Sequence, residues 1–179
     1  MPAILKLSRA VDTVNTAVGR LAEWLVLIVV LIGAATAALR YLFNYGSNGF
    51  LEIQWYLFGA MVLLGASYTL KRNEHVRVDL VYGYLWRRGR LVVDTIGFAL
   101  FLLPATAYLA WLSWPVFANA WRIGETSPNF GGLIRWPIYL MLPLGFALLT
   151  LQGVSELIKR IVALRSGVAV ETEYVPPTQ

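Results

Sequence analysis

The sequence has no cysteine and a single histidine, and both shortages narrow the chemistry open to it. Without cysteine there can be no disulfide, no thiolate metal site and no cysteine nucleophile. One histidine excludes bis-histidine haem ligation by this chain alone. Charge is scarce as well, at 14% of residues, whereas soluble domains carry about 25%. These shortages favour a chain that is not an enzyme and holds no cofactor.

Apolar residues make up 58% of the 179 residues, and they occur in long uninterrupted runs. A transmembrane helix needs about 20 apolar residues to cross roughly 30 Å of hydrocarbon. Four uncharged runs of 16, 18, 27 and 20 residues approach or exceed that length: Trp24–Leu39, Ile53–Leu70, Thr95–Trp121 and Trp136–Ser155. Only a helix satisfies its own backbone hydrogen bonds within one such segment. The sequence therefore predicts an all-α integral membrane protein with four transmembrane helices.

The membrane domain is expected to cover residues 21–160. Its spans are predicted at about residues 22–43, 52–70, 94–121 and 135–156. Arg40 would snorkel at the end of the first span. Pro104 and Pro115 should kink or end the third span locally. Residues 161–179 are predicted to form a polar cytoplasmic tail.

Residues 1–20 precede the first uncharged run and have a pattern of their own. Apolar residues recur there at helical spacing, with polar residues between them: Ile4, Leu7, Val11, Val14 and Val18. This pattern predicts an amphipathic interfacial helix that lies in the headgroup plane. The middle loop holds a candidate for a second, short in-plane helix, with three spaced apolar residues on one side: Val76, Leu80 and Tyr84.

A cleaved signal peptide is the competing interpretation of the first span, because Ala35-Thr36-Ala37 resembles a cleavage site. About 20 residues with an amphipathic pattern precede the apolar run, which is atypical of a short n-region and favours a retained span.

The distribution of lysine and arginine predicts the orientation. Twelve of the 15 lie in the N-terminal segment, the middle loop and the C-terminal segment; the other three are Arg40, Arg122 and Arg135. Cytoplasmic segments carry the excess of cations, so both termini should be cytoplasmic. The expected location is the bacterial inner membrane. The net charge of +5 sits at the edges of apolar runs, which suits the phospholipid bilayer and not nucleic acid.

Few ionisable groups approach the membrane interior, where such groups are functional candidates by default. Glu52 stands at the start of the second span; it is either a partner contact or an ordinary carboxylate favoured by the helix dipole. His75 lies beside Glu74 but has no nucleophile motif near it. The spans lack paired carboxylates and the broken helix pairs of transporters, so a helper role is indicated.

The candidate contact residues fall into two groups. Contacts to a partner protein are expected at the second and third spans: Glu52, Gln54, Trp55, Trp111 and Trp114. Contacts to lipid headgroups are expected from the cations of the middle loop: Lys71, Arg72, Arg87, Arg88 and Arg90.

Several local motifs resemble the small membrane subunit of TRAP transporters, the tripartite ATP-independent periplasmic transporters. They are Glu52-Ile53-Gln54-Trp55-Tyr56-Leu57-Phe58, then Leu64-Gly65-Ala66, then His75-Val76-Arg77-Val78-Asp79. Thr126-Ser127-Pro128, Trp136-Pro137 and Leu142-Pro143-Leu144-Gly145 also match the entry to the family's fourth span. The resemblance covers about residues 20–160, and within the middle loop it rests on His75, Arg77 and Asp79.

The resemblance implies an accessory subunit of a sodium-driven, binding-protein-dependent secondary transporter for organic acids. Its partners would be a large multi-span transporter subunit, which carries the substrate and sodium sites, and a periplasmic substrate-binding protein. The small subunit would brace the large one and help to dock the binding protein. Two other functions stay open: the membrane anchor of a respiratory enzyme complex and a small exporter working as a homodimer.

Overall fold

The computed structural model describes residues 3–74 and 85–166, and within them the chain is helical. The helices are α1 (Ala3–Phe43), α2 (Asn48–Arg72), α4 (Arg87–Gly97), the π-helical turn η1 (Phe98–Leu102), α5 (Leu103–Ile123) and α6 (Trp136–Ser166). In the described residues the β-structure is limited to one isolated bridge between Thr126 and Ile134. Four helical stretches are long and apolar enough to cross a membrane: Ile4–Phe43, Asn48–Arg72, Arg87–Ile123 and Trp136–Arg165. The all-α membrane fold predicted from the sequence is confirmed.

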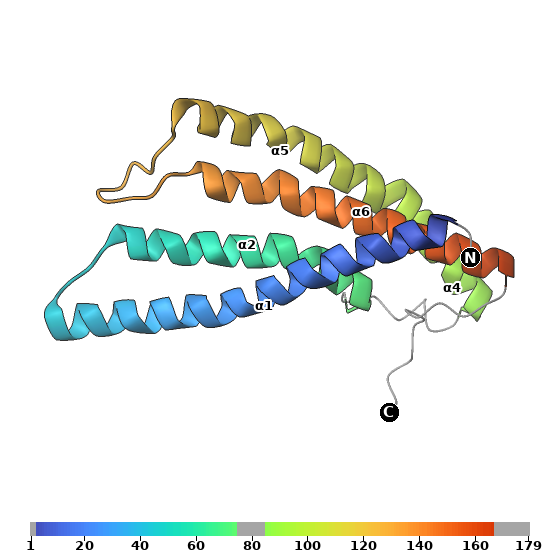
Figure 1. The fold of residues 1–179 in the computed structure, drawn as a ribbon, viewed down its shortest axis with the longest axis horizontal. Coiled ribbons are helices and arrows are strands. Elements are labelled where there is room, and N and C mark those ends of the chain that lie inside the picture. Colours follow the sequence, from blue (N-terminus) through green and yellow to red (C-terminus); the bar gives the residue numbers. More distant parts are fainter. Residues whose placement is uncertain (1–2, 75–84, 167–179) are drawn as a thin grey trace.

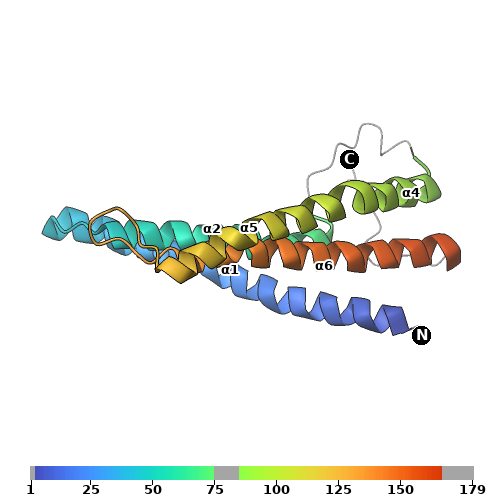
Figure 2. The same ribbon diagram turned by 90° about the horizontal axis from the view of Figure 1, so that it is seen from above.

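The long helices form an open layer and not a closed bundle (Figure 1). Helix α2 packs between α1 and α6, and α6 packs between α2 and α5. Seen from above, the layer is thin and spreads towards one end (Figure 2). We call that end, where α1 begins and α6 finishes, the terminal end; the end with the 44–47 and 124–135 connections is the loop end. An open layer leaves most apolar side chains of the spans on the outside of the chain.

Helix α1 differs from the expectation of a separate interfacial helix at residues 1–20. It runs as one helix of 41 residues from Ala3 to Phe43, with no break near residue 20. Polar side chains of its first half, among them Ser8 and Asn15, are buried and bond to α6. The polar side of this segment thus faces α6 and not water, and its side chains form hydrogen bonds there. The segment therefore need not lie in the headgroup plane, and α1 continues directly into the span. The candidate in-plane helix around Val76, Leu80 and Tyr84 lies outside the described residues.

The third span is built from α4, η1 and α5 in continuous succession. Pro104 has no N–H and cannot close the usual hydrogen bond to the carbonyl four residues earlier. The chain accommodates it through the preceding π-helical turn, in which the Leu103 N–H donates to the Phe98 carbonyl. Pro115 lies inside α5, which continues past it to Ile123. The local irregularity expected at the prolines is therefore found at Pro104.

Helix α6 extends to Ser166, beyond the predicted end of the fourth span. Ala163 is buried, so the added turns at the terminal end pack against the rest of the chain. Residues 161–166, which were expected to belong to the tail, are thus part of the helix.

Close helix approach replaces an extensive apolar core. In the part of the chain that the structure describes, one cluster of buried apolar residues is found where α1, α2 and α6 meet; it consists of Ala22, Leu64 and Leu148. Just beyond it, a Cβ atom placed on Gly145 would lie 2.8 Å from both the Cβ atom and the carbonyl oxygen of Leu63. Only a residue without a side chain lets the α2 and α6 backbones come this near.

We predict that Gly145→Ala separates α2 from α6 and lowers the melting temperature of the detergent-solubilised protein, with a loss of about 1–3 kcal/mol from overpacking. Gly65→Ala is the matched control, because a Cβ atom at Gly65 meets nothing within 4 Å. That control should be neutral or stabilising, since alanine is the better helix former. Equal melting temperatures for the two variants would contradict the role of Gly145.

Candidate functional site

A cluster at the loop end fixes the α5–α6 connection to the start of α2. The Glu52 carboxylate accepts hydrogen bonds from the Ser127 hydroxyl, from Asn129 Nδ2 at 2.8 Å and from the Leu133 N–H at 2.7 Å. We call Glu52 with Ser127, Asn129 and Leu133 the loop-end clasp. Three donors from one loop converge on one buried carboxylate, so Glu52 determines where that loop lies.

The loop itself is closed by further bonds. The Ser127 N–H donates to the Leu133 carbonyl at 2.9 Å, and Arg135 pairs with Glu125 at 3.4 Å. Asn48 Nδ2, from the first residue of α2, donates to the Phe130 carbonyl at 3.0 Å. At the apex, the Phe130 side chain is 96% exposed. A firmly held loop therefore presents an aromatic ring away from the protein.

A second polar cluster joins α1, α4 and α6 at the terminal end. We call it the terminal-end network; its members are Ser8, Asp12, Asn15, Asp94, Gln152, Ser155, Glu156, Lys159 and Arg160. Most of them are buried, and Gln152 and Glu156 are fully enclosed. The largest fully buried side chains of the described chain are therefore polar, which is the reverse of a soluble core.

Ion pairs form the centre of this network. Arg160 donates to Glu156 at 2.6 Å and to Asp94 at 3.1 Å. Lys159 pairs with Asp12 at 2.7 Å and with Glu156 at 2.8 Å. The Arg160 guanidinium also lies over the Phe98 ring, 4.4 Å from its centre. Each cation thus has two carboxylate partners, as buried charges require.

Neutral groups complete the network towards the membrane. Asn15 Nδ2 donates to Gln152 Oε1 at 2.7 Å, and Gln152 Nε2 donates to Asp12 at 2.9 Å. The Ser8 and Ser155 hydroxyls lie 2.7 Å apart. These bonds join residues 137 to 147 positions apart in the chain, so they hold the first helix against the last.

This network was not predicted from the sequence. Lys159 and Arg160 belong to the C-terminal segment, whose cations indicated only a cytoplasmic location, and no contact was predicted for Asp94. The available signal was the spacing of polar residues on one face of α6, at positions 152, 155, 156, 159 and 160. A polar stripe of this kind on a helix that begins as an apolar span indicates contact with another polar surface.

The residues predicted to contact a partner protein do not form one cluster. Glu52 is occupied by the loop-end clasp, and Gln54 donates from Nε2 to the Phe50 carbonyl of its own helix at 2.8 Å. Trp55 on α2 is exposed. Trp111 and Trp114 lie on α5, the helix at the edge of the layer, and are 70% and 56% exposed. The tryptophans remain available for a partner, whereas Glu52 has a demonstrable role inside the chain.

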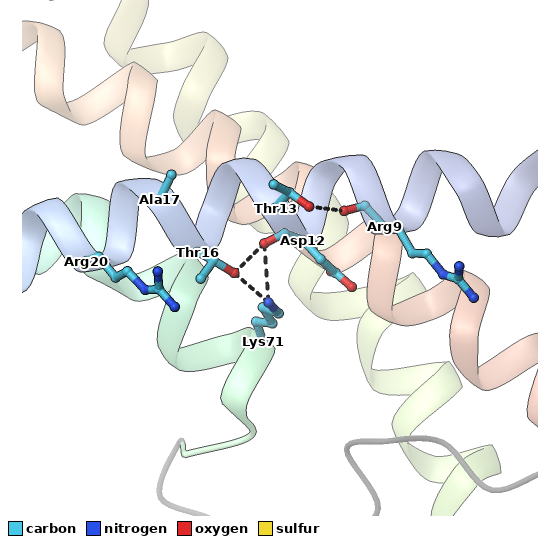
Figure 3. Close-up of a pocket in the computed structure, with 7 residues that line it drawn as sticks. All are labelled: Arg9, Asp12, Thr13, Thr16, Ala17, Arg20 and Lys71. Carbon is cyan, nitrogen blue, oxygen red and sulfur yellow. Dashed lines mark hydrogen bonds between the residues drawn. The ribbon is translucent and has the colours of Figure 1, made fainter.

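The predicted headgroup anchors have different surroundings. Lys71 Nζ donates to Thr16 Oγ1 at 2.5 Å and to the Asp12 carbonyl at 3.3 Å, so it joins α2 to α1 (Figure 3). Arg72 pairs with Glu74 at 2.8 Å and bonds to Tyr68. The remaining three lie at the start of α4: Arg87, Arg88 and Arg90. The middle-loop residues His75, Arg77 and Asp79 lie outside the described residues.

Within residues 3–74 and 85–166, no group of three or more His, Cys, Asp or Glu side chains could hold a metal ion. The two polar clusters can position helices and loops: their carboxylates accept hydrogen bonds, and those of the terminal-end network also pair with cations.

Comparison with known proteins agrees with the resemblance. Residues 29–163 match the family model described as the DctQ component of tripartite ATP-independent periplasmic transporters. A relative from Vibrio cholerae, the C4-dicarboxylate TRAP transporter small permease protein DctQ, is 30% identical over 142 residues. The aligned stretch covers 68% of this chain and 61% of the relative's length.

We predict that Arg160→Met destabilises the protein strongly. The change leaves Glu156 and Asp94 without a buried cation they share, and losing one partner of a buried pair costs about 3–5 kcal/mol. The measurement is the melting temperature in detergent, with exposed Arg165→Met on the same helix as the control. A double variant that also carries Glu156→Gln should recover part of the loss. An Arg160→Met protein that melts like the control would show that the pairs contribute little.

Proposed function

Since the chain belongs to the DctQ-component family of tripartite ATP-independent periplasmic (TRAP) transporters, we propose that it braces the large subunit of a sodium-driven transporter for organic acids. In this role the chain is the small permease subunit and carries neither the substrate site nor the sodium site. It performs no catalysis. The family match does not favour the alternative, a membrane anchor of a respiratory enzyme.

The open helix layer is the observation that carries this proposal. In lipid the hydrophobic effect does not hold helices together, so an isolated protein of this kind normally closes around small residues and polar links. Here the charged links lie at the two ends, and the faces between them are largely apolar and exposed. Such a layer can lie flat against another membrane protein and widen its footprint in the bilayer.

The outward face of α5 is the proposed contact with the large subunit. Trp111 and Trp114 are both exposed, whereas Thr106 of the same helix is buried and bonds to Thr150 of α6 at 2.8 Å. Tryptophan is enriched among residues that contribute most to protein contacts. We therefore assign these two side chains to the interface, with exposed Trp55 on α2 as a further contact.

The chain is a multi-pass membrane protein, and we propose that both termini face the cytoplasm of a bacterial cell. The terminal end carries most of the lysine and arginine, in keeping with the positive-inside rule. The loop end, with Glu52 and the 124–135 connection, then faces the periplasm.

The substrate class comes from the family and not from a site in this chain. The Vibrio cholerae relative is named for C4-dicarboxylate transport, and organic acids are the class we propose here. A periplasmic binding protein would deliver the substrate. The loop-end clasp suits the docking of such a protein, because it holds Phe130 outward on a loop that need not become ordered on binding.

We predict that the tagged chain copurifies stoichiometrically with a large multi-span transporter subunit, and that the pair with a binding protein takes up an organic acid in proteoliposomes when sodium is supplied. Trp111→Ala with Trp114→Ala should reduce copurification by about tenfold or more, since interface tryptophans contribute about 2 kcal/mol or more.

The matched control is Trp24→Ala, an exposed tryptophan on α1, the opposite edge of the layer. It should leave copurification unchanged. Sodium-driven uptake by this chain alone would contradict the accessory role, and equal losses in both variants would place the contact elsewhere.

A second prediction tests the orientation and the docking together. The chain has no cysteine, so Phe130→Cys creates a single reactive thiol at the loop apex. We expect a membrane-impermeant maleimide to label this thiol in intact spheroplasts. The binding protein should slow the labelling by covering the loop. Glu52→Ala should remove this protection from labelling, because it releases the loop. Trp86→Cys, at an exposed position beside α4, should react only after permeabilisation. Labelling of the two thiols in the reverse order would invert the proposed topology, and an unchanged rate with binding protein would exclude docking at this loop.

A further inference from the structure

A hollow opens on the surface between α1 and the end of α2, outside both polar clusters. It has a volume of about 440 Å³. We call it the α1–α2 hollow; it is lined by Arg9, Asp12, Thr13, Thr16, Ala17, Arg20 and Lys71. Figure 3 shows Lys71 reaching from α2 towards α1, at a point between Arg9 and Arg20.

The hollow has an excess of positive charge. Arg9 and Arg20 lie 11 residues apart on α1, which places them about 16 Å apart along the helix, with Lys71 between them. Among the described residues that line the hollow, Asp12 is the only carboxylate. Its side chain is directed to α6, where Lys159 pairs with it at 2.7 Å and Ser155 donates to it at 3.0 Å. Because Asp12 is directed inward, it does not neutralise Lys71 and Arg20 in the hollow.

Lys71 is held by neutral oxygens. Within the described residues its Nζ atom donates to Thr16 Oγ1 and to the Asp12 carbonyl. The Thr13 and Thr16 hydroxyls donate to carbonyl groups of their own helix, so they offer no proton to a ligand. The donors offered to an anion in this hollow are thus the Lys71 ammonium and the Arg20 guanidinium, groups of the kind that bind phosphate in proteins.

An apolar stripe leads away from the hollow along α1. Positions 9, 13, 16 and 20 lie on one face of the helix, and the next residues on that face at helical spacing are Trp24, Leu27 and Leu31. All three are exposed. The first uncharged run begins at Trp24, one turn beyond Arg20, so the hollow lies at headgroup depth and the stripe lies in the hydrocarbon region.

We propose that the α1–α2 hollow binds the phosphate of an anionic phospholipid of the cytoplasmic leaflet, and that the acyl chains of this lipid follow the Trp24–Leu27–Leu31 stripe. The proposal rests on the orientation given under the proposed function. Basic pockets between helices on the cytoplasmic side are the setting in which anionic headgroups bind. The cationic hollow continues directly into the apolar stripe, which suits a phosphate group that carries acyl chains. A free phosphate would contact only the hollow.

The test is native mass spectrometry of the full chain purified in a mild detergent, together with any large subunit that copurifies. The probes are palmitoyl-oleoyl phosphatidylglycerol, the zwitterionic phosphatidylethanolamine with the same chains, and inorganic phosphate. We expect retention of phosphatidylglycerol, little retention of phosphatidylethanolamine, and no competition from inorganic phosphate at equal concentration.

Charge removal in the hollow should weaken phosphatidylglycerol binding by about fivefold for each cation, in Lys71→Gln and in Arg20→Gln. Lys71→Arg should retain binding, because the charge stays. Arg122→Gln is the control. It removes an exposed cation at the loop end, where the Arg122 guanidinium donates to Asn119 of its own helix.

Unchanged phosphatidylglycerol binding in Lys71→Gln and Arg20→Gln would overturn the proposal, as would equal retention of phosphatidylethanolamine. Full competition by inorganic phosphate would replace the lipid by a free anion and so would also overturn it. Copurification of the large subunit is read from the same spectra, so loss of the lipid with the complex intact is distinguished from failure of the proposed function.

Discussion

The structure depends on the buried ion pair between Arg160 and Glu156. Burying two charges is costly, and the cost is offset here because each charge meets further partners: Asp94 for the arginine and Lys159 for the glutamate. These contacts lie at the terminal end, where α4 and the first half of α1 both pack against α6. In hydrocarbon, apolar side chains gain nothing by leaving lipid for one another, so polar contacts at the helix ends determine which helices stay together.

The same constraint explains the open shape. Glu52 holds the loop end, the terminal-end network holds the other end, and between them the helices touch through small residues such as Gly145. Nothing in this scheme requires the faces of the layer to be covered by the chain itself. The apolar faces are therefore available for lipid or for a partner, which is the geometry expected of a subunit that supports another membrane protein.

The four spans could be predicted because their signal is local: each is an uncharged run of about hydrocarbon length, with a carboxylate at one end and a cation at the other. Glu52 could be selected for the same reason, as a carboxylate at the start of a run, although its three loop donors could not. The terminal-end network could not be predicted, because its hydrogen bonds join Ser8 and Asn15 to residues more than 130 positions away in the sequence. A helix with polar residues on one side has the same periodicity whether that side faces headgroups or another helix, so the sequence of α1 could not distinguish an interfacial helix from a packed one.

Asp12 shows how the two sides of α1 are coupled. Its carboxylate receives Lys159 from α6, while its backbone carbonyl receives Lys71 from α2. One residue thus sets the position of the first helix against both of its neighbours, and it separates a neutralised interior from a cationic surface. Because the acid is directed inward, the α1–α2 hollow keeps its positive charge; if it turned outward, Lys159 would lose one of its two carboxylate partners. The burial of charge between α1 and α6 and the exposure of charge beside α2 are therefore consequences of a single side-chain orientation.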